Sequence, residues 1–178
     1  MALKATIFKA ELQLSDMDRH HYQTHALTLA RHPSETDERM LLRLAAFALN
    51  ADARLEFTKG ISSEDEPDLW LKSLSGEIEL WIELGQPDEK RMRRACGRAR
   101  RVVVYPYAER SAATWWKQNA DSFKRFDNLS VAFLSQSGGA ALSDLAQRNM
   151  ALTCTIQEGQ LWFSDGTREA TLEVEGWK

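Results

Sequence analysis

The sequence is poor in cysteine, and this limits the kinds of scaffold and site that it can build. Its only cysteines, Cys96 and Cys154, lie far apart, with no CxxC pair and no spacing typical of zinc ligands. A disulfide-rich scaffold and a zinc ribbon are therefore excluded. We expect both thiols to be reduced and buried.

Long apolar runs and a targeting layout are also lacking. No stretch approaches the roughly 20 apolar residues that a transmembrane helix requires. Residues 1–4 lead directly into an alternating segment, without the layout of a signal peptide. We therefore expect a cytoplasmic protein that makes no membrane contact.

An excess of positive charge is missing as well. The formal net charge is −3, which argues against a protein that coats nucleic acid non-specifically. The chain has no phosphate-binding glycine loop, no nucleophile elbow and no Cys–His pair with supporting spacing. These absences disfavour a small-molecule enzyme of those classes. The length of 178 residues fits one domain spanning residues 1–178.

What is present is organised around the segment from Ile61 to Arg101. At its centre, apolar and other side chains alternate: Ile78, Leu80, Ile82 and Leu84 against Glu77, Glu79, Trp81 and Glu83. A period of two predicts a β-strand with one apolar and one acidic face. We expect the four apolar side chains to be buried beneath a helix, and Glu83 to share a face with Glu79.

The rest of the chain predicts helices and strands alternating in the middle and β-hairpins at both ends. Strand patterns occur at residues 2–14, 22–30, 55–58, 102–105, 129–134, 152–156, 161–163 and 171–174. Helix patterns occur at 34–50, with Ser34 as N-cap, and at 87–97, 109–119 and 140–149. Residues 65–70 predict a short helix or turn, and 135–139 a loop. This order predicts a mixed α/β domain whose central sheet is flanked by helices, with terminal hairpins that pair with each other or extend the sheet.

Three histidines, His20, His21 and His25, fall at the start of the second strand segment. Residues four apart on a strand share a face, so His21 and His25 should lie on the same side. A solvated polar face is the ordinary interpretation of such a pair, and a metal site is the alternative.

Acids before and on the central strand, with cations after it, are arranged as a metal and phosphate site requires. Asp68 follows Pro67 ahead of the strand, and Glu83 lies near the strand's end. The downstream cations are Lys90, Arg91, Arg93, Arg94, Arg98, Arg100 and Arg101. Two carboxylates can hold Mg²⁺, and nearby cations can neutralise a phosphate. The structural alternative makes Asp68 an exposed acid at a helix start and the basic run a solvated helix face.

Several segments resemble the bacterial YaeQ family, and together they cover essentially the whole chain. They are Met1–Ile7, Thr28–Arg43, Asp65–Pro67, Leu80–Gly85 and Thr155–Gln157. The resemblance implies a cytosolic protein with a restriction-endonuclease-like fold, similar to that of the PD-(D/E)xK nuclease superfamily. It leaves the biochemical activity open.

Carried over residue by residue, the superfamily pattern implies Asp68 as the first acid and Glu83 as the second, both as possible Mg²⁺ ligands. It implies Glu38 as the acid of the first helix. The pattern also asks for lysine two residues after the second acid, and that position is Gly85. Lys90, on the following helix, is the best substitute. The candidate catalytic residues are therefore Glu38, Asp68, Glu83 and Lys90, and the candidate nucleic-acid-binding residues are Arg91, Arg94 and Arg98.

Two functions follow from this pattern. One is a Mg²⁺-dependent phosphodiesterase acting on DNA or RNA, and the other is a catalytically inactive nuclease-like scaffold that binds nucleic acid or a protein partner. Converging acids repel one another, so at least one carboxyl should have a raised pKa. In a metal site, replacing Asp68 or Glu83 with its amide should leave the metal-free protein equally stable or slightly more stable.

Overall fold

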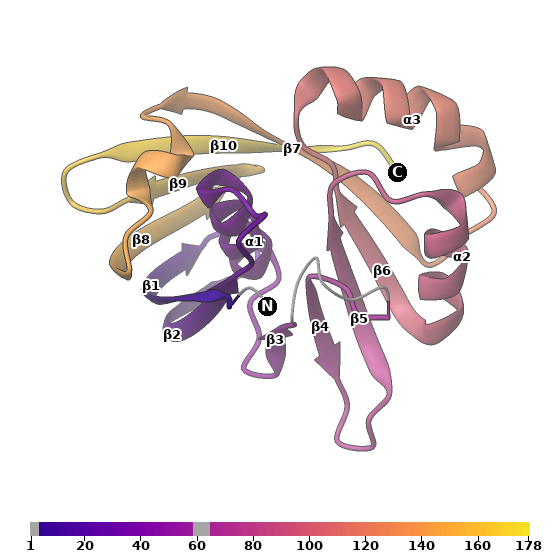
Figure 1. The fold of residues 1–178 in the computed structure, drawn as a ribbon, viewed down its shortest axis with the longest axis horizontal. Helices are drawn as coiled ribbons and strands as arrows, with labels where there is room; N and C mark the ends of the chain where they lie inside the picture. Colours follow the sequence, from indigo (N-terminus) through magenta and orange to yellow (C-terminus); the bar gives the residue numbers. More distant parts are fainter. Residues whose placement is uncertain (1–3, 59–64) are drawn as a thin grey trace.

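The computed structural model describes residues 4–58 and 65–178. Their strands form one ten-stranded mixed sheet with the order β2-β1-β8-β9-β10-β7-β6-β5-β4-β3 (Figure 1). In chain order the elements are β1 (Thr6–Asp16), β2 (His21–Arg31), α1 (Asp37–Leu49), β3 (Leu55–Phe57), β4 (Leu69–Lys72), β5 (Ile78–Leu84), α2 (Glu89–Arg98), β6 (Ala99–Tyr105), α3 (Glu109–Phe123), β7 (Leu129–Gly139), the 3₁₀ turn η2 (Leu142–Leu145), β8 (Asn149–Gln157), β9 (Gln160–Ser164) and β10 (Glu169–Gly176). The predicted mixed α/β class is confirmed.

The two ends of the chain meet within the sheet. β1 and β2 form an antiparallel hairpin, and β1 also pairs in parallel with β8. β8, β9 and β10 follow one another antiparallel, and β10 then pairs with β7. The terminal hairpins therefore pair with each other and extend the sheet, as predicted.

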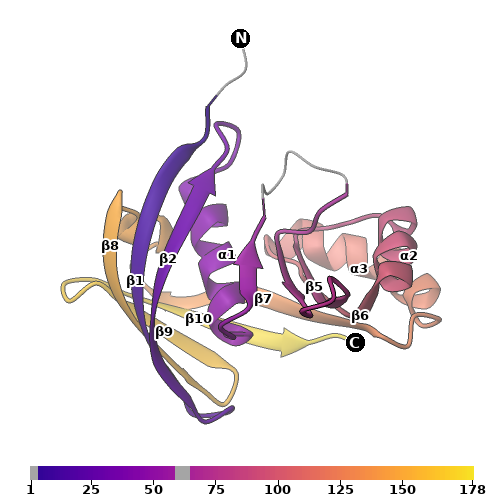
Figure 2. The same ribbon diagram turned by 90° about the horizontal axis from the view of Figure 1, so that it is seen from below.

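Helix α1 lies inside the curve of the sheet (Figure 2). Its residues 40–48 are all buried, so the helix is enclosed on every side rather than along one stripe. Around it lies the inner core, to which β1, β5, β8, β9 and β10 all contribute apolar side chains. The sheet and this helix thus enclose a single large core.

Helices α2 and α3 cover the other face of β5, β6 and β7. There Trp81, Val102 and Val104 pack with Met92 of α2 and Trp115 of α3 in a second, outer core. The centre of β6 is therefore covered on both faces, with Val102 and Val104 buried in the outer core and Val103 partly buried against the inner core.

A β-bulge in β5 changes which side chains face α1. Lys72 pairs with Ile78, but Leu71 pairs with Leu80, so Glu79 is an extra residue relative to β4. Leu80, Ile82 and Leu84 face the inner core, whereas Ile78 lies in the outer core with Trp81. The prediction that Ile78 shares their face is wrong.

Two segments differ from their predicted state in the second half of the chain. Residues 135–139 continue β7 instead of forming a loop, because β10 supplies their hydrogen-bond partners. Gly139 there has φ +82°, and a Cβ at this position would lie 2.3 Å from the Glu169 carbonyl oxygen, so only glycine fits. The predicted helix at 140–149 is reduced to the turn η2.

Both cysteines are free thiols, as predicted; Cys154 is buried, but Cys96 is only half-buried, so the prediction that both are buried is wrong for Cys96. No helix in the described ranges has the length and apolar character to cross a bilayer. His21 and His25 do share a strand face, with 3.0 Å between their Nε2 atoms. The His25 ring also packs edge-on against Phe47 of α1.

Candidate functional site

The first part of the site is the turn that leads into α1. Thr36 is the N-cap, since its hydroxyl accepts a hydrogen bond from the Arg39 backbone N–H at 3.1 Å. The prediction of Ser34 as the cap is wrong, because Ser34 instead contacts the His32 ring. The buried carboxylate of Glu35 therefore lies just ahead of the helix, beside its first turns.

Glu35 is held between two arginines of α1. Its oxygens lie 2.6 Å from Arg39 Nη1 and 2.6 Å from Arg43 Nη2. Arg43 is only 1% exposed and also donates to the Ala30 carbonyl of β2. This pairing connects the start of α1 to the β1–β2 hairpin, and it presents Arg39 toward the middle of the sheet.

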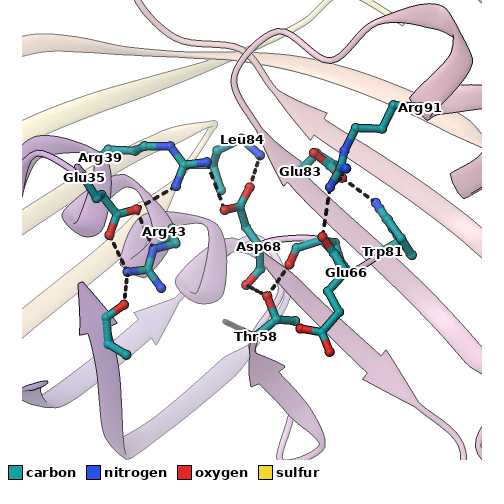
Figure 3. A network of polar contacts seen from close by, with 12 residues as sticks. Glu35, Arg39, Arg43, Thr58, Glu66, Asp68, Trp81, Glu83, Leu84 and Arg91 are labelled. Atoms are coloured by element: carbon teal, nitrogen blue, oxygen red, sulfur yellow. Dashed lines mark hydrogen bonds and ion pairs between the residues drawn. The ribbon is translucent and has the colours of Figure 1, made fainter. Parts of the chain in front are cut away.

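Asp68 is placed by the end of β5. Its backbone N–H donates to the Ile82 carbonyl at 3.0 Å, just before β4 begins. Its Oδ2 accepts from the Leu84 backbone N–H at 2.8 Å, and its Oδ1 lies 2.9 Å from Arg39 Nη2 (Figure 3). The side chain is buried, and each carboxylate oxygen has a protein donor. No helix forms at 65–70; the segment bends directly into β4.

Glu83 lies on the side of Asp68 opposite to Arg39, and its side chain contacts α2 (Figure 3). Its Oε1 accepts from Trp81 Nε1 at 3.0 Å and from Arg91 Nε at 2.7 Å. Glu79, in contrast, pairs with Arg54 and lines a cavity with Leu80 of the inner core. The prediction that Glu79 and Glu83 share a face is therefore wrong, and the bulge is the reason.

The electrostatics of the site match its burial and pairing. Burial raises the pKa of Glu83, Arg91 opposes the shift, and the charge of Asp68 adds to it. The predicted raised carboxyl pKa is confirmed in direction, with burial as the larger cause. Burial alone would lower the pKa of Arg39, but Asp68 and Glu35 more than offset this and raise it. Arg39 is therefore a permanent cation.

The residues present do not fit a divalent metal in this arrangement. Mg²⁺ needs several oxygen ligands at about 2.0–2.1 Å. Here Arg39 forms an ion pair with Asp68, and Arg91 forms one with Glu83, so the four side chains together have no net charge. Within residues 4–58 and 65–178, no three His, Cys, Asp or Glu side chains are grouped to hold a metal ion.

The other two candidate catalytic residues lie away from the paired acids. Glu38 is exposed on α1 and lines a separate cavity with Leu42 and Tyr107. Lys90 is exposed on α2 and lines a small pocket with its neighbour Arg91. The structure thus brings Asp68, Glu83 and Arg91 together, and it is Arg91 that supplies the cation at Glu83.

Backbone conformation explains the absence of lysine at position 85. Gly85 has φ +104°, in the region that favours glycine. A Cβ would come no closer than 3.9 Å to the Tyr107 ring, so there is space for a side chain. The backbone, rather than a lack of room, makes a lysine unfavourable here.

The three candidate nucleic-acid-binding residues also bind the segment before β4. Arg91 donates to the Glu66 carbonyl at 2.9 Å, and Arg98 to the Asp65 carbonyl at 2.8 Å. Arg94 lies 3.7 Å from the Asp65 carboxylate and keeps 45% of its side chain exposed. Arg91 and Arg98 thus have a structural role, and Arg94 is more exposed than Arg91.

The site contains two residues that sequence reasoning missed, Glu35 and Arg39. Their mutual contact spans four positions, a spacing that brings side chains together at a helix start, so this local signal was available. The contact of Arg39 with Asp68 spans 29 positions and carries no local signal.

Comparisons with known proteins place the chain among close relatives. A family model described as "YaeQ protein" matches residues 1–174. The uncharacterised YaeQ protein of Salmonella typhi is 48% identical over all of this chain and 98% of its own length, and that of Escherichia coli K12 is 47% identical over the same shares. The crystal structure of a YaeQ protein from Xanthomonas axonopodis pv. citri matches with a TM-score of 0.91 at 48% identity, covering 98% of each chain. A YaeQ protein from Pseudomonas syringae matches with a TM-score of 0.89 at 32% identity, over 98% of this chain and 96% of its own.

Proposed function

Because the chain belongs to the YaeQ family, a membership that leaves its activity open, we propose from the geometry that it is a catalytically inactive nuclease-like scaffold that binds nucleic acid. The observation that carries this proposal is the pairing of both candidate metal ligands with arginine. Asp68 is neutralised by Arg39, and Glu83 by Arg91.

The order of elements supports the nuclease-like part of the proposal. A helix, α1, is followed by the antiparallel strands β3, β4 and β5, then by α2 and the parallel strand β6. Asp68 lies just before β4, Glu83 lies near the end of β5, and the cations begin on α2. We take these six elements as the restriction-endonuclease-like core, which the terminal hairpins enlarge.

The charge pairing supports the non-cleaving part. A metal-dependent phosphodiesterase needs carboxylate oxygens free to hold Mg²⁺ and lower the pKa of a bound water. To admit Mg²⁺, this site would have to release Arg39 from Asp68 and Arg91 from Glu83, and each partly buried arginine would lose a carboxylate partner. Gly85 also leaves the superfamily's lysine position without a side chain.

The surface of α2 supports nucleic acid as the ligand. Beside the paired acids, a small pocket of about 200 Å³ is lined by Asp88, Lys90, Arg91 and Arg94. Asp88 is engaged as the N-cap of α2, where it accepts from the Arg91 backbone N–H at 2.8 Å. Lys90 and Arg94 are left as exposed cations one turn apart, a spacing suited to phosphate contacts. The net charge of −3 restricts such binding to this local surface.

The test is a binding and cleavage assay on one set of variants. Fluorescence anisotropy with single-stranded and duplex DNA and RNA should show binding that Lys90→Ala with Arg94→Ala weakens. The slope of log K against log salt should fall by about 1 for each lost phosphate contact. The matched control is Arg110→Ala with Lys117→Ala, which removes two exposed cations from α3.

The same oligonucleotides, incubated with Mg²⁺ or Mn²⁺, test the inactive scaffold. We expect no cleavage and no rise in melting temperature on adding either metal. Metal-dependent cleavage that disappears in Asp68→Asn would establish the phosphodiesterase instead. Equal losses of affinity in the α2 and α3 variants would refute α2 as the binding surface. No binding to any oligonucleotide would refute nucleic-acid binding and leave a protein partner as the ligand.

A further inference from the structure

The cavity that Glu79 lines lies at the far end of α1 from Asp68. It has a volume of about 460 Å³ and is lined by Arg19, Asn50, Asp52, Arg54, Leu71, Glu79, Leu80, Arg100 and Arg101. Asp68 contacts Arg39 in the first turns of the helix, whereas Asn50 is the C-cap at its end. The arginines come from the β1–β2 turn, the α1–β3 loop and the start of β6, so the fold collects them from three separate segments. With four arginines and two acids, the lining is net positive.

Within the described ranges, Arg101 is the arginine of this pocket that has no ion pair. It pairs across the sheet with Leu80, and Val103 and Tyr105 follow on the same inner face. Its guanidinium makes no ion pair or side-chain hydrogen bond with any residue of the described ranges, and it is exposed to the pocket. Because Arg101 is the exposed first residue of this inner-face series on β6, its guanidinium is available to an external anion.

Arg19 is held in place beside the pocket by the end of α1. Its guanidinium donates to the Leu49 carbonyl at 3.3 Å and the Ala51 carbonyl at 3.0 Å. It thereby offsets the negative end of the helix dipole, which would otherwise repel an anion. The Asp16 carboxylate is 3.7 Å away, and 42% of the Arg19 side chain stays exposed. Arg19 is therefore a positioned cation with donors to spare.

The remaining charges in the lining are largely balanced. Arg54 lies 3.3 Å from Glu79 and 3.6 Å from Asp52. Glu79 reaches this pocket because of the bulge in β5. Arg100 pairs at 2.6 Å with Glu77, which lies outside the lining. Counting Asp16 and Glu77, the ion-pair partners outside the lining, the four arginines face four acids, and Arg101 is the arginine of the lining that has no ion pair within the described ranges.

Arg19 and Arg101 line the same pocket, and their charges both act on the buried Tyr105 hydroxyl. Burial raises the pKa of Tyr105 to about 12, while its hydrogen bond from Asn50 and the charges of Arg19 and Arg101 oppose the rise. Asn50 lines the pocket and donates to Tyr105 Oη at 2.8 Å. Because Arg19 and Arg101 line one pocket of about 460 Å³, a single ligand can contact both guanidinium groups.

We propose that this pocket binds a small phosphate ester, with its phosphate on Arg19 and Arg101. Guanidinium groups match phosphate oxygens in a bidentate geometry, which makes arginine suited to this role. Leu71 and Leu80 provide an apolar wall for the organic part of the ligand. The volume falls within the roughly 300–1,000 Å³ range of small-molecule sites. The site is separate from α2 and does not depend on the proposed nucleic-acid binding.

The test is calorimetric titration of the full chain with adenosine monophosphate, pyrophosphate and adenosine at one ionic strength. We expect the monophosphate to bind, pyrophosphate to bind more weakly, and adenosine not to bind. Arg101→Ala should weaken binding of the monophosphate at least about tenfold, the size of one charge-assisted hydrogen bond. Because Arg101 has no partner in the described ranges, this variant should melt at the wild-type temperature.

Two further variants make the result specific. Glu79→Gln removes a carboxylate from the lining and should tighten binding, whereas Lys117→Ala on α3 should leave it unchanged. Unchanged affinity in Arg101→Ala, weaker binding in Glu79→Gln, or an equal loss in Lys117→Ala would overturn the proposal. So would the absence of any phosphate binding. Pyrophosphate binding as tightly as the monophosphate would overturn the role of the apolar wall.

Discussion

Replacing Asp68 tests most directly whether the paired acids are structural. Asp68→Ala removes the acceptor of the buried Leu84 N–H and one of the two carboxylate partners of Arg39. A buried donor left without a partner costs about 1–3 kcal/mol. Arg39 keeps its ion pair with Glu35, so the cost of losing Asp68 as its partner should fall below the roughly 3–5 kcal/mol of leaving a buried charge unpaired. We expect a total loss of about 3 kcal/mol in the free energy of unfolding, a large part of a typical 5–15 kcal/mol.

Asp68→Asn should be milder, because the amide oxygen can still accept from the Leu84 N–H. We expect it to cost about 1–2 kcal/mol through the weakened contact with Arg39. This reverses the expectation from the sequence, in which amides in a metal site leave the metal-free protein as stable as before. The ion pairs seen here are the reason for the reversal.

Urea unfolding at pH 7, with and without Mg²⁺, measures these effects. The midpoint should fall with an unchanged m-value. Glu11→Gln, an exposed acid on β1, is the control for loss of charge and should change stability by no more than about 0.5 kcal/mol. The reasoning is refuted if Asp68→Asn is as stable as wild type and Mg²⁺ stabilises only the wild type.

Three further changes test the fold and its titration. Ile82→Ala should cost about 2–5 kcal/mol in urea unfolding, since Ile82 is fully buried against the inner core, whereas Leu74→Ala, at a fully exposed position, should cost less than about 0.5 kcal/mol. Burial, and then the charge of His21, lower the pKa of His25 below 6.5, so the unfolded chain binds more protons than the folded protein below that pH. The contribution of neutral His25 to stability should therefore be fully present above pH 6.5 and should be lost as the pH falls below it. His25→Gln should flatten that loss in thermal melts across about pH 5–8. Gly85→Lys should cost about 1–2 kcal/mol because of its positive φ, and a cleavage assay should still show no metal-dependent activity.

The periodicity of the sequence predicted most of the elements, and its failures have physical causes. Alternation located β5 and the inward direction of Leu80, Ile82 and Leu84. It misplaced Ile78 because a period of two assumes that each residue of β5 pairs with one residue of β4. Glu79 is an extra residue in that pairing, and only the register of β4 reveals it. Residues 135–139 have the composition of a loop, and they form a strand because β10 lies beside them.

The candidate site was predictable only in part. The charge of Asp68 acts on Glu83, so the two acids belong to one site, but their carboxylates pair with different arginines. Their arginine partners could not be assigned in advance. Arg39 reaches Asp68 across the fold, and Arg91 rather than its neighbour Lys90 faces Glu83 because of where α2 begins, one residue after its Asp88 cap.

The parallel pairing of β1 with β8 has a consequence for how the chain folds. The pairing of β1 with β2 is local and can form early. The other edge of β1 pairs with β8, residues 149–157, near the other end of the sequence. Such distant contacts slow folding, because a long loop must close before they form. During synthesis one edge of β1 therefore stays unpaired until almost the whole protein has been made, and this edge can pair with other chains. Truncation after β7 should leave that edge exposed permanently and favour aggregation over folding.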